Sequence, residues 1–357
     1  MVSDMNCLRT VFPWVKLPLV VSAPMLGAAT PKLALNVSGA GGLGFLAGGT
    51  DPKALDTTFA QVKSLRKPHT GSLVANKDFL PVGVGFQLFN SSLSPLAEVI
   101  GRHCPAAVWL FAPEKTEDIR SWSRTIRDVT SRQSQIWIQV GSVAEAEKIL
   151  SIAEPDVFVA QGSDAGGHGR ARSGSIISLV PEVVDMLNRA KRPDIPVLAA
   201  GGIVEARGFA AALALGASGV VMGTRFLASE EAGVAAGWKN ELIRCSDGGV
   251  ATIRSTLCDR LKETKGWPAQ YDGRAISNRG HVDEHAGMTD DQNIALYQQE
   301  LQMGDGAWDQ TQRRMVAYAG TGVGLIHQIK SAADIVREML EGVEHIHSGI
   351  SHRLDGD

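Results

Sequence analysis

Cysteine is scarce in this sequence. The chain of 357 residues contains four, Cys7, Cys104, Cys245 and Cys258, and no two of them form a CxxC pair. Scattered thiols at this density are typical of a reducing compartment, and they predict neither a disulfide framework nor a zinc site. We therefore expect a cytoplasmic protein without a bound metal.

Long apolar runs and an excess of one charge are also lacking. The apolar stretch 17–29 is interrupted by Pro18, Pro24 and Gly27, so it predicts a buried strand with its turns rather than a membrane helix or a signal peptide. The formal net charge is -3, with acidic and basic residues interspersed, which argues against the basic stripe of a nucleic-acid-binding protein. We expect neither a membrane nor a nucleic acid as partner.

What the sequence does contain is a regular alternation of short apolar runs with longer amphipathic segments. Continuous apolar runs are typical of parallel strands that are buried on both faces. Eight strand–helix units predict an α/β protein with a closed (β/α)8 TIM barrel, whereas a six-stranded open sheet would lack two of the units. The predicted strands are 20–23, 42–46, 82–86, 107–111, 136–140, 156–160, 196–200 and 219–222.

The pattern changes after Leu227. We expect residues 1–227 to form the barrel, 228–330 a mainly helical cap or lid over its mouth, and 331–357 a C-terminal helix and tail that pack back on the barrel. Within the cap, 230–244 and 294–301 have helical spacing, whereas 248–293 is polar and loop-rich.

Two glycine loops follow the last two predicted strands. Gly201-Gly202 ends the seventh strand and opens a helix, and Gly223-Thr224 ends the eighth. Glycine lets backbone N–H groups approach a phosphate, and a helix N-terminus adds partial positive charge. Phosphate sites recur at these two positions of (β/α)8 barrels. Together the loops predict a phosphate site, although Gly-Gly also makes ordinary turns.

The loop after the sixth strand, residues 161–169, places four glycines around Asp164 and His168. Gly166 and Gly167 would let the backbone press against a planar ligand while His168 presents an imidazole to it. Because an imidazole titrates near neutral pH, His168 is the candidate acid/base residue. Alternatively, His168 only ties the loop to a backbone carbonyl. Asp164 could orient His168 or its own turn.

Other strand ends offer further contacts to a planar ligand. Ala23, Pro24 and Met25 follow the first strand, and Met offers an apolar, polarizable surface. Gly85 and Gln87 end the third strand, and Gln139 lies near the end of the fifth. Each Gln amide could hydrogen-bond the edge of a ring, or be only a polar group at a strand end.

Three further patterns are weaker. Residues 319–324, AGTGVG, suggest a dinucleotide fingerprint but lack its βαβ context, so we expect a tight loop that folds onto the barrel mouth. His281 and His285 have the spacing of a metal pair, but no third ligand is evident and the segment has the character of an exposed loop. Arg170 and Arg172 could add positive charge near His168 or be solvated.

These motifs resemble those of the nitronate monooxygenase family, formerly called 2-nitropropane dioxygenases, and especially its eukaryotic, fungal-type members. The segments that carry the resemblance are 23–25, 39–44, 82–86, 161–169, 199–203, 222–226 and 319–326. The resemblance implies non-covalently bound FMN, with Gly201, Gly202, Gly223 and Thr224 at its phosphate, Gly166 and Gly167 beside its ring system, and His168 as the catalytic residue. The chain departs from many bacterial members at Asp164, where they carry Glu.

The resemblance further implies that O2 oxidises an alkyl nitronate, or a nitroalkane that His168 deprotonates, to a carbonyl compound and nitrite without NAD(P)H. A homodimer is a possible assembly. Alternatives from the same analysis are an FMN-dependent enoyl-thioester reductase that uses NAD(P)H, a related flavin oxidoreductase of a biosynthetic pathway, and a catalytically silent flavin-binding protein.

Overall fold

The computed structural model describes residues 8–66, 79–308 and 313–355, and its centre is a closed barrel of eight parallel strands. Leu19 of the first strand pairs with Gly219 of the last to complete the ring. The strands are β1 (Leu19–Ser22), β2 (Leu43–Ala47), β3 (Leu80–Gln87), β4 (Pro105–Phe111), β5 (Gln135–Val140), β6 (Val157–Gln161), β8 (Val197–Ala200) and β9 (Gly219–Met222). The predicted TIM barrel is confirmed, and the six-stranded open sheet is excluded.

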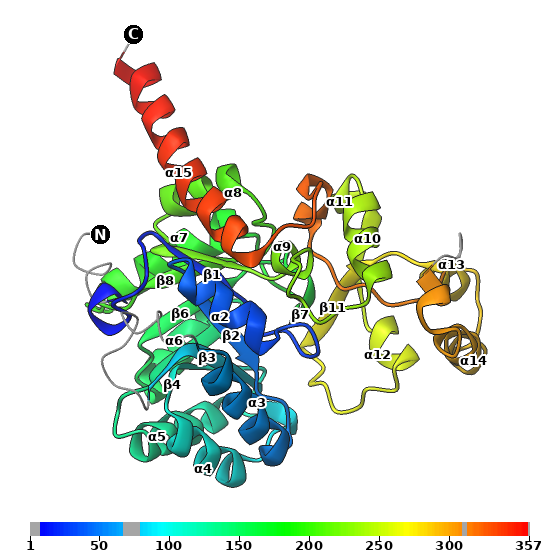
Figure 1. Ribbon diagram of the computed structural model, residues 1–357, viewed down its shortest axis with the longest axis horizontal. Helices are drawn as coiled ribbons and strands as arrows, with labels where there is room; N and C mark the ends of the chain where they lie inside the picture. The colour runs from blue at the N-terminus through cyan, green and yellow to red at the C-terminus, as the bar shows by residue number, and fades with distance from the viewer. Residues whose placement is uncertain (1–7, 67–78, 309–312, 356–357) are drawn as a thin grey trace.

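Helices surround the barrel (Figure 1). They are α2 (Pro31–Gly39), α3 (Pro52–Leu65), α4 (Leu93–His103), α5 (Thr116–Val129), α6 (Val143–Ile152), α7 (Ile176–Arg189) and α8 (Ala206–Ala214). The side chains of Thr30 and Asp51 cap the N-termini of α2 and α3, because they accept hydrogen bonds from N–H groups of the first turn. A proline follows each of these caps, at a position where its missing N–H costs no helical hydrogen bond.

Aromatic side chains fill the barrel interior. The ring centroid of Phe45 lies 5.0 Å from that of Trp137 and 5.3 Å from that of Trp109. Gly83 makes room for Phe45, since a Cβ at this position would lie 2.3 Å from the ring. Phe12, from the segment before β1, belongs to the same core cluster. As in other barrels of this class the interior is a packed core, so a ligand has to bind at the mouth.

A second sheet joins the barrel to the segment that follows it. Strand β7 (Gly167–Arg170) comes between β6 and α7 in the chain but lies outside the barrel sheet. It pairs antiparallel with β11 (Tyr271–Ile276), which pairs antiparallel with β10 (Thr252–Ser255). In Figure 1, β7 and β11 lie between the barrel and the helices of the cap, α10 and α12 to α14.

The cap is more ordered than the sequence analysis expected. Its helices are α10 (Ala236–Arg244), α11 (Gly248–Ala251), α12 (Leu257–Leu261), α13 (Arg279–His285) and α14 (Asp290–Leu301). The short helix α9 (Thr224–Leu227) precedes them at the end of the barrel segment. The prediction of a loop-rich 248–293 is therefore wrong, because β10 and β11 are short, polar strands that gain their order by pairing with β7, far away in the chain. The helix predicted over 230–244 begins only at Ala236.

The C-terminal helix α15 (Ala332–Asp355) spans most of the segment 331–357, for which a helix and a tail were expected. It packs against α8 and α2. A Cβ at Gly342 would lie 2.5 Å from the Cβ of Ala206, so glycine allows α15 and α8 to approach closely. The far end of α15 points away from the barrel (Figure 1).

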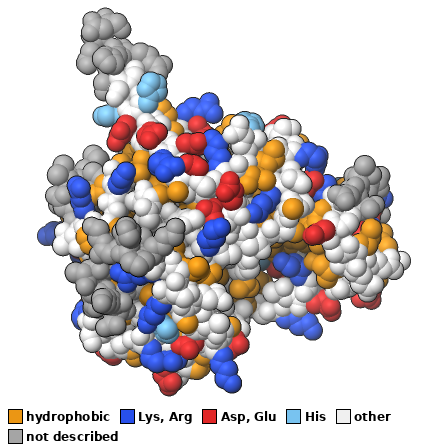
Figure 2. Space-filling view, in the orientation of Figure 1, with side chains coloured by type: hydrophobic (Ala, Val, Ile, Leu, Met, Phe, Trp, Pro, Cys, Tyr) orange, Lys and Arg blue, Asp and Glu red, His pale blue; other side chains and the backbone are white. Residues whose placement is uncertain are grey.

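The surface mixes both charges. Acidic and basic side chains are interspersed over the face that Figure 2 shows. Among the described residues, no helix combines the length and the apolar character that crossing a bilayer requires.

Candidate active site

The residues predicted to contact a ligand lie on one rim of the barrel. Parallel strands all end at the same edge, so the residues after β1, β3, β8 and β9 meet around the mouth. A Cβ at Gly85 would lie 2.5 Å from Cγ of Pro24. The Cβ position of Gly223 is 3.7 Å from Sδ of Met25 and 3.9 Å from Cβ of Ala23. The structure thus brings these five residues together.

Four backbone N–H groups on this rim lack a protein acceptor. Within the described residues, the N–H groups of Gly201, Gly202, Gly223 and Thr224 donate no hydrogen bond to the protein. Gly201 and Gly202 have φ values of +108° and +74°, and a Cβ at Gly201 would lie 2.9 Å from the backbone nitrogen of Ala165. Other residues rarely adopt such φ values. Partnerless N–H groups on two adjacent loops fit an anion such as a phosphate.

The helix after Gly201-Gly202 does not contribute as predicted. Helix α8 begins only at Ala206, and the carboxylate of Glu205 accepts hydrogen bonds from the N–H groups of Arg207 and Gly208. Burial opposes ionisation of Glu205, but the hydrogen bonds from Arg207 and the two N–H groups hold the pKa of its carboxyl below the usual range. The predicted helix N-terminus at the phosphate is therefore wrong, because its first N–H groups already have an acceptor.

The Gly-rich segment 319–324 folds onto the same rim, as expected. The N–H of Gly320 donates to Oγ1 of Thr224 at 2.9 Å, and the N–H of Thr321 donates to the carbonyl of Asp164 at 3.0 Å. The segment continues into a 3-10 turn, η4 (Thr321–Leu325), and not into a helix that follows a parallel strand. The segment 319–324 therefore joins two rim loops through hydrogen bonds and is not a dinucleotide-binding loop.

The two glycines before His168 have different surroundings. A Cβ at Gly166 would lie 2.4 Å from the carbonyl carbon of Ala319, so protein backbone packs on this glycine and leaves no room for a side chain. The contact of the Gly166 backbone with a planar ligand stays a prediction. Gly167 has a φ of +68°, and a Cβ there would meet nothing within 4 Å. The open space that a planar ligand needs is therefore beside Gly167.

A chain of side-chain amides ties the His168 loop to the barrel core. Nε1 of Trp109 donates to Oε1 of Gln139 at 3.2 Å, and Nε2 of Gln139 donates to Oε1 of Gln161 at 2.7 Å. Nε2 of Gln161 then donates to the carbonyl of His168 at 3.2 Å. Gln139, predicted to contact a ligand, thus uses both its oxygen and its nitrogen to position the loop. The side-chain amide of Gln87 has no hydrogen-bond partner among the described residues.

Two arginines of the cap hold the other side of this loop. Nη2 of Arg254 donates to the carbonyl of Gly169 at 3.1 Å, and Nη2 of Arg274 donates to the carbonyl of Ser163 at 3.2 Å. Arg254 also forms an ion pair with Asp272. Burial, together with the like charge of Arg254, lowers the pKa of Arg274. The loop is therefore fixed from both the barrel and the cap, with positive charge at its backbone.

The imidazole of His168 is held by cap residues. Its Nε2 lies 2.9 and 3.0 Å from the two carboxylate oxygens of Asp259 in α12. The ring of Trp267 is parallel to it, with 3.8 Å between centroids and 6° between planes. Asp164 is not the partner of His168, because its contribution is the carbonyl that accepts the Thr321 N–H. His168 also does more than tie its loop to a backbone carbonyl, since its side chain pairs with a carboxylate.

Aromatic rings form an apolar wall beside this imidazole. Trp267 lies 4.5 Å from Phe89, 6.1 Å from Phe111 and 6.1 Å from Tyr271 between ring centroids. Phe89 and Phe111 come from the ends of β3 and β4, whereas Trp267 and Tyr271 belong to the cap. The barrel and the cap therefore share the surface around His168.

The two candidate cations near His168, Arg170 and Arg172, differ in exposure and in ion pairing. Arg170 donates to both oxygens of Glu145, at 3.1 and 2.7 Å, and its guanidinium lies 5.2 Å from the ring centroid of Tyr271. Burial and the charge of Glu145 raise the pKa of Tyr271. Arg172 is exposed and forms no ion pair within the described part of the chain. Arg170 is thus a half-buried cation paired with Glu145, not a solvated one.

The interpretation of His281 as an exposed loop residue is wrong. His281 is buried in α13, where its Nδ1 lies 2.9 Å from Oδ1 of Asn278 and its Nε2 lies 3.3 Å from Oγ of Ser255. Burial lowers its pKa. His285 is exposed. Over the described ranges, no three His, Cys, Asp or Glu side chains are placed to hold a metal.

Cys104, Cys245 and Cys258 are free and buried. Cys7 lies outside the described residues.

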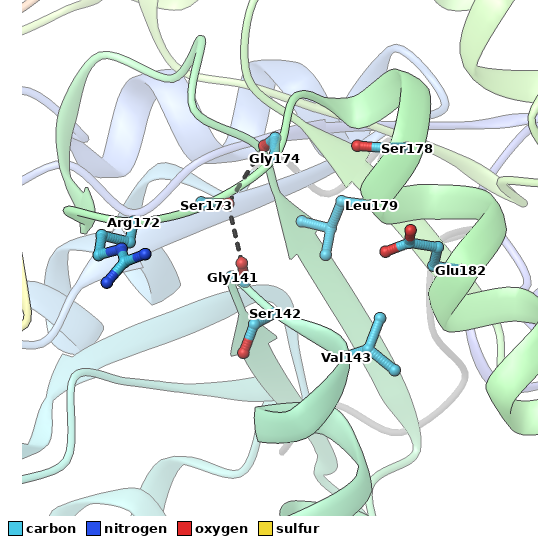
Figure 3. A pocket seen from close by; sticks show the side chains of 9 residues that line it. All are labelled: Gly141, Ser142, Val143, Arg172, Ser173, Gly174, Ser178, Leu179 and Glu182. Carbon is cyan, nitrogen blue, oxygen red and sulfur yellow. Dashed lines mark hydrogen bonds between the residues drawn. The ribbon is translucent and has the colours of Figure 1, made fainter.

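A separate cavity of about 320 Å³ opens between the loops after β5 and β7 and helix α7 (Figure 3). Oγ of Ser173 donates to the carbonyl of Gly141 across it, at 2.8 Å. Its lining includes neither His168 nor the Gly201 and Gly223 loops. The candidate acid/base residue His168 and the partnerless N–H groups therefore lie elsewhere, on the rim.

Comparisons with known proteins agree with this architecture. A family model described as "Nitronate monooxygenase" matches residues 124–342. The "Nitronate monooxygenase npaC" of Metarhizium robertsii is 43% identical over 336 residues, which cover 93% of this chain and 93% of the relative. The "Nitronate monooxygenase" of Neurospora crassa is 37% identical over 357 residues, covering 94% and 91%. The "Structure of FabK from Thermotoga maritima" has a TM-score of 0.75 at 24% identity, covering 97% and 98%, and supports the fold alone.

Proposed function

Because this chain belongs to the nitronate monooxygenase family, we propose that it uses bound FMN and O2 to oxidise alkyl nitronates to a carbonyl compound and nitrite. The observation that carries the proposal is the placement of His168 on the same rim as four partnerless backbone N–H groups. An acid/base group next to an anion-binding cradle suits a flavin phosphate and an anionic substrate.

The residues on the rim fit a phosphorylated flavin. The N–H groups of Gly201, Gly202, Gly223 and Thr224 would hold the phosphate. The half-buried residues Ala23–Met25, together with Gly85, Gln87 and the open space beside Gly167, would receive the ring system. When bound, FMN would supply the electron transfer to O2 that side chains of this site cannot supply.

His168 would act on the proton of the substrate. From a neutral nitroalkane it would remove the proton on the carbon that bears the nitro group. The C–H electron pair then forms the C=N bond of the nitronate, and the imidazole becomes imidazolium. A nitronate arrives already ionised and needs no such step, so there the imidazolium would stabilise the anion.

The first test is the absorption spectrum of the purified protein, followed by chromatography of the chromophore released on denaturation. We expect a flavin spectrum and FMN. Under air, propyl nitronate should then give nitrite. His168→Asn should retain FMN but lower the turnover of the neutral nitroalkane, whose proton has to be removed, by about 100-fold or more. Absence of nitrite with every nitronate tried would contradict the proposal. Light scattering on the same sample tests the expected homodimer.

The reductase alternative makes an opposite prediction. An enoyl-thioester reductase has to take hydride from NAD(P)H, so NAD(P)H would bleach the flavin rapidly without O2. We expect no bleaching faster than that of free flavin. The catalytically silent alternative would leave the output of the His168→Asn variant unchanged.

A further inference from the structure

We propose that Asp259 is the positioning residue of His168. It fixes the proton of the neutral imidazole on Nε2, which leaves Nδ1 as the nitrogen that takes the substrate's proton. This inference rests on the proposed function and adds to it the atom that acts as the base.

The geometry commits Nε2 to the carboxylate. Both oxygens of Asp259 lie within 3.0 Å of Nε2, and the two side chains are only 12% and 11% exposed. In the described part of the chain, no Lys or Arg forms an ion pair with Asp259, and the ammonium of nearby Lys262 lies over the ring of Tyr318, 5.0 Å from its centroid. An ionised carboxylate only accepts hydrogen bonds, so Nε2 has to donate. A neutral imidazole has one N–H, and its lone pair is then on Nδ1.

The other neighbours of His168 keep the ring in this orientation. Stacking on Trp267 at 3.8 Å restricts tilting. The backbone of His168 is paired with Gly273 of β11, and the carbonyl of His168 accepts the hydrogen bond from Gln161. Flipping the ring would turn a C–H toward the carboxylate and lose a charge-assisted hydrogen bond. Within the described residues Nδ1 has no hydrogen-bond partner, so it is available to a substrate.

This arrangement suits removal of a proton from carbon. The C–H bond breaks, its electron pair forms the C=N bond of the nitronate, and the proton adds to Nδ1. The ring becomes imidazolium, and the charge of Asp259 compensates it in a partly buried site. No oxidant is involved in this step.

The chain offers a matched control pair. Nε2 of His103 lies 2.8 Å from Oδ1 of Asp56, as in the His168–Asp259 pair. This pair joins α4 to α3, two of the helices that surround the barrel. Asp56→Asn therefore makes the same chemical change outside the site.

The kinetic test compares a nitroalkane with its preformed nitronate. An Asn side chain can donate to Nε2 and so favour the opposite tautomer. Asp259→Asn should lower kcat for the nitroalkane by about 100-fold or more, and kcat for the nitronate by less than about tenfold. Asp259→Ala should act in the same direction, and Asp56→Asn should change neither value. Equal losses for the two substrates, or no loss, would overturn the proposal.

A second readout does not depend on turnover. In protein with 15N-labelled histidine, the spectrum should show neutral His168 protonated on Nε2, with His168→Asn identifying the signals. Asp259→Asn should move the proton toward Nδ1. Protonation on Nδ1 in the unaltered protein would overturn the proposal. If no nitro compound is turned over, the proposed function fails, while this spectrum still decides the role of Asp259.

Discussion

Replacing Gly201 by Asp tests the phosphate site directly. The backbone there has a φ of +108°, and a Cβ would lie 2.9 Å from the nitrogen of Ala165 and 3.0 Å from the carbonyl oxygen of Gly162. Both contacts are with backbone, which cannot rotate away. We expect the conformational strain alone to cost about 1–3 kcal/mol.

The effect on the cofactor should be much larger than the effect on the fold. With about 2.1 cal/mol/K of unfolding entropy per residue, a loss of about 1–3 kcal/mol lowers the Tm of a chain of 357 residues by about 1–4 °C. A carboxylate about 4 Å from a phosphate charge repels it by about 4 kcal/mol at an effective dielectric constant of about 20. That repulsion corresponds to about a thousandfold weaker binding.

Gly287→Asp provides the control. Gly287 has a φ of +93°, but a Cβ there would meet nothing within 4 Å, and it lies in the turn between α13 and α14. Both variants are measured for flavin per chain and for Tm. Gly287→Asp should keep its flavin despite a similar strain, whereas Gly201→Asp should be purified nearly colourless. Normal flavin content in Gly201→Asp would refute the assignment of the phosphate to this loop.

Three further predictions concern other parts of the site and the fold. Trp267→Ala removes the ring stacked on His168 and should lower kcat/KM for nitrite release by about 2- to 12-fold. This range corresponds to the loss of one aromatic pair, which contributes about 0.5–1.5 kcal/mol. Glu145→Gln breaks its ion pair with the half-buried Arg170 and should lower the free energy of unfolding in urea by about 1–3 kcal/mol. Burial, with the charge of Asp259, raises the pKa of Cys258 to about 12. Above about pH 9 only the unfolded thiol ionises, so stability should fall by up to about 1.4 kcal/mol per pH unit.

Each of these predictions has its own control. Trp267→Phe should keep most of the activity, and a loss as large as in Trp267→Ala would argue against stacking as the cause. Asp194→Asn breaks an exposed ion pair with Arg192 and should change stability by less than about 1 kcal/mol. If Asp194→Asn loses as much stability as Glu145→Gln, burial of the ion pair does not explain the loss. Cys258→Ala should reduce the alkaline slope, and an unchanged slope would assign it to other groups.

The barrel could be predicted because its signal is local. Each of its strands is a continuous apolar run such as VFVA or GVVM, and a strand buried on both faces needs such a run. The glycines of the Gly201 and Gly223 loops were placed on the rim for the same reason, since the carboxyl ends of parallel strands meet there. The packing of Ala319 on Gly166 could not be predicted, because the two residues lie far apart in the chain.

The cap side of the site could not be predicted in the same way. Asp259 lies 91 residues from His168, in the unremarkable segment LCDRL. Trp267 lies in a polar stretch with no periodicity of its own. Strand β7 has the sequence GHGR, which has no strand propensity. These residues acquire their positions only through antiparallel pairing with β11, and single-sequence patterns carry no information about such distant pairing.

Strand β7 has a consequence for recombination among homologous genes. It places His168 opposite Gly273, so the candidate acid/base residue is in register with a strand encoded about a hundred codons later. A crossover between the two segments would combine a histidine from one parent with the carboxylate and indole from the other. Viable chimaeras should therefore inherit residues 161–170 and 252–276 as one block, and shuffled libraries should show this linkage.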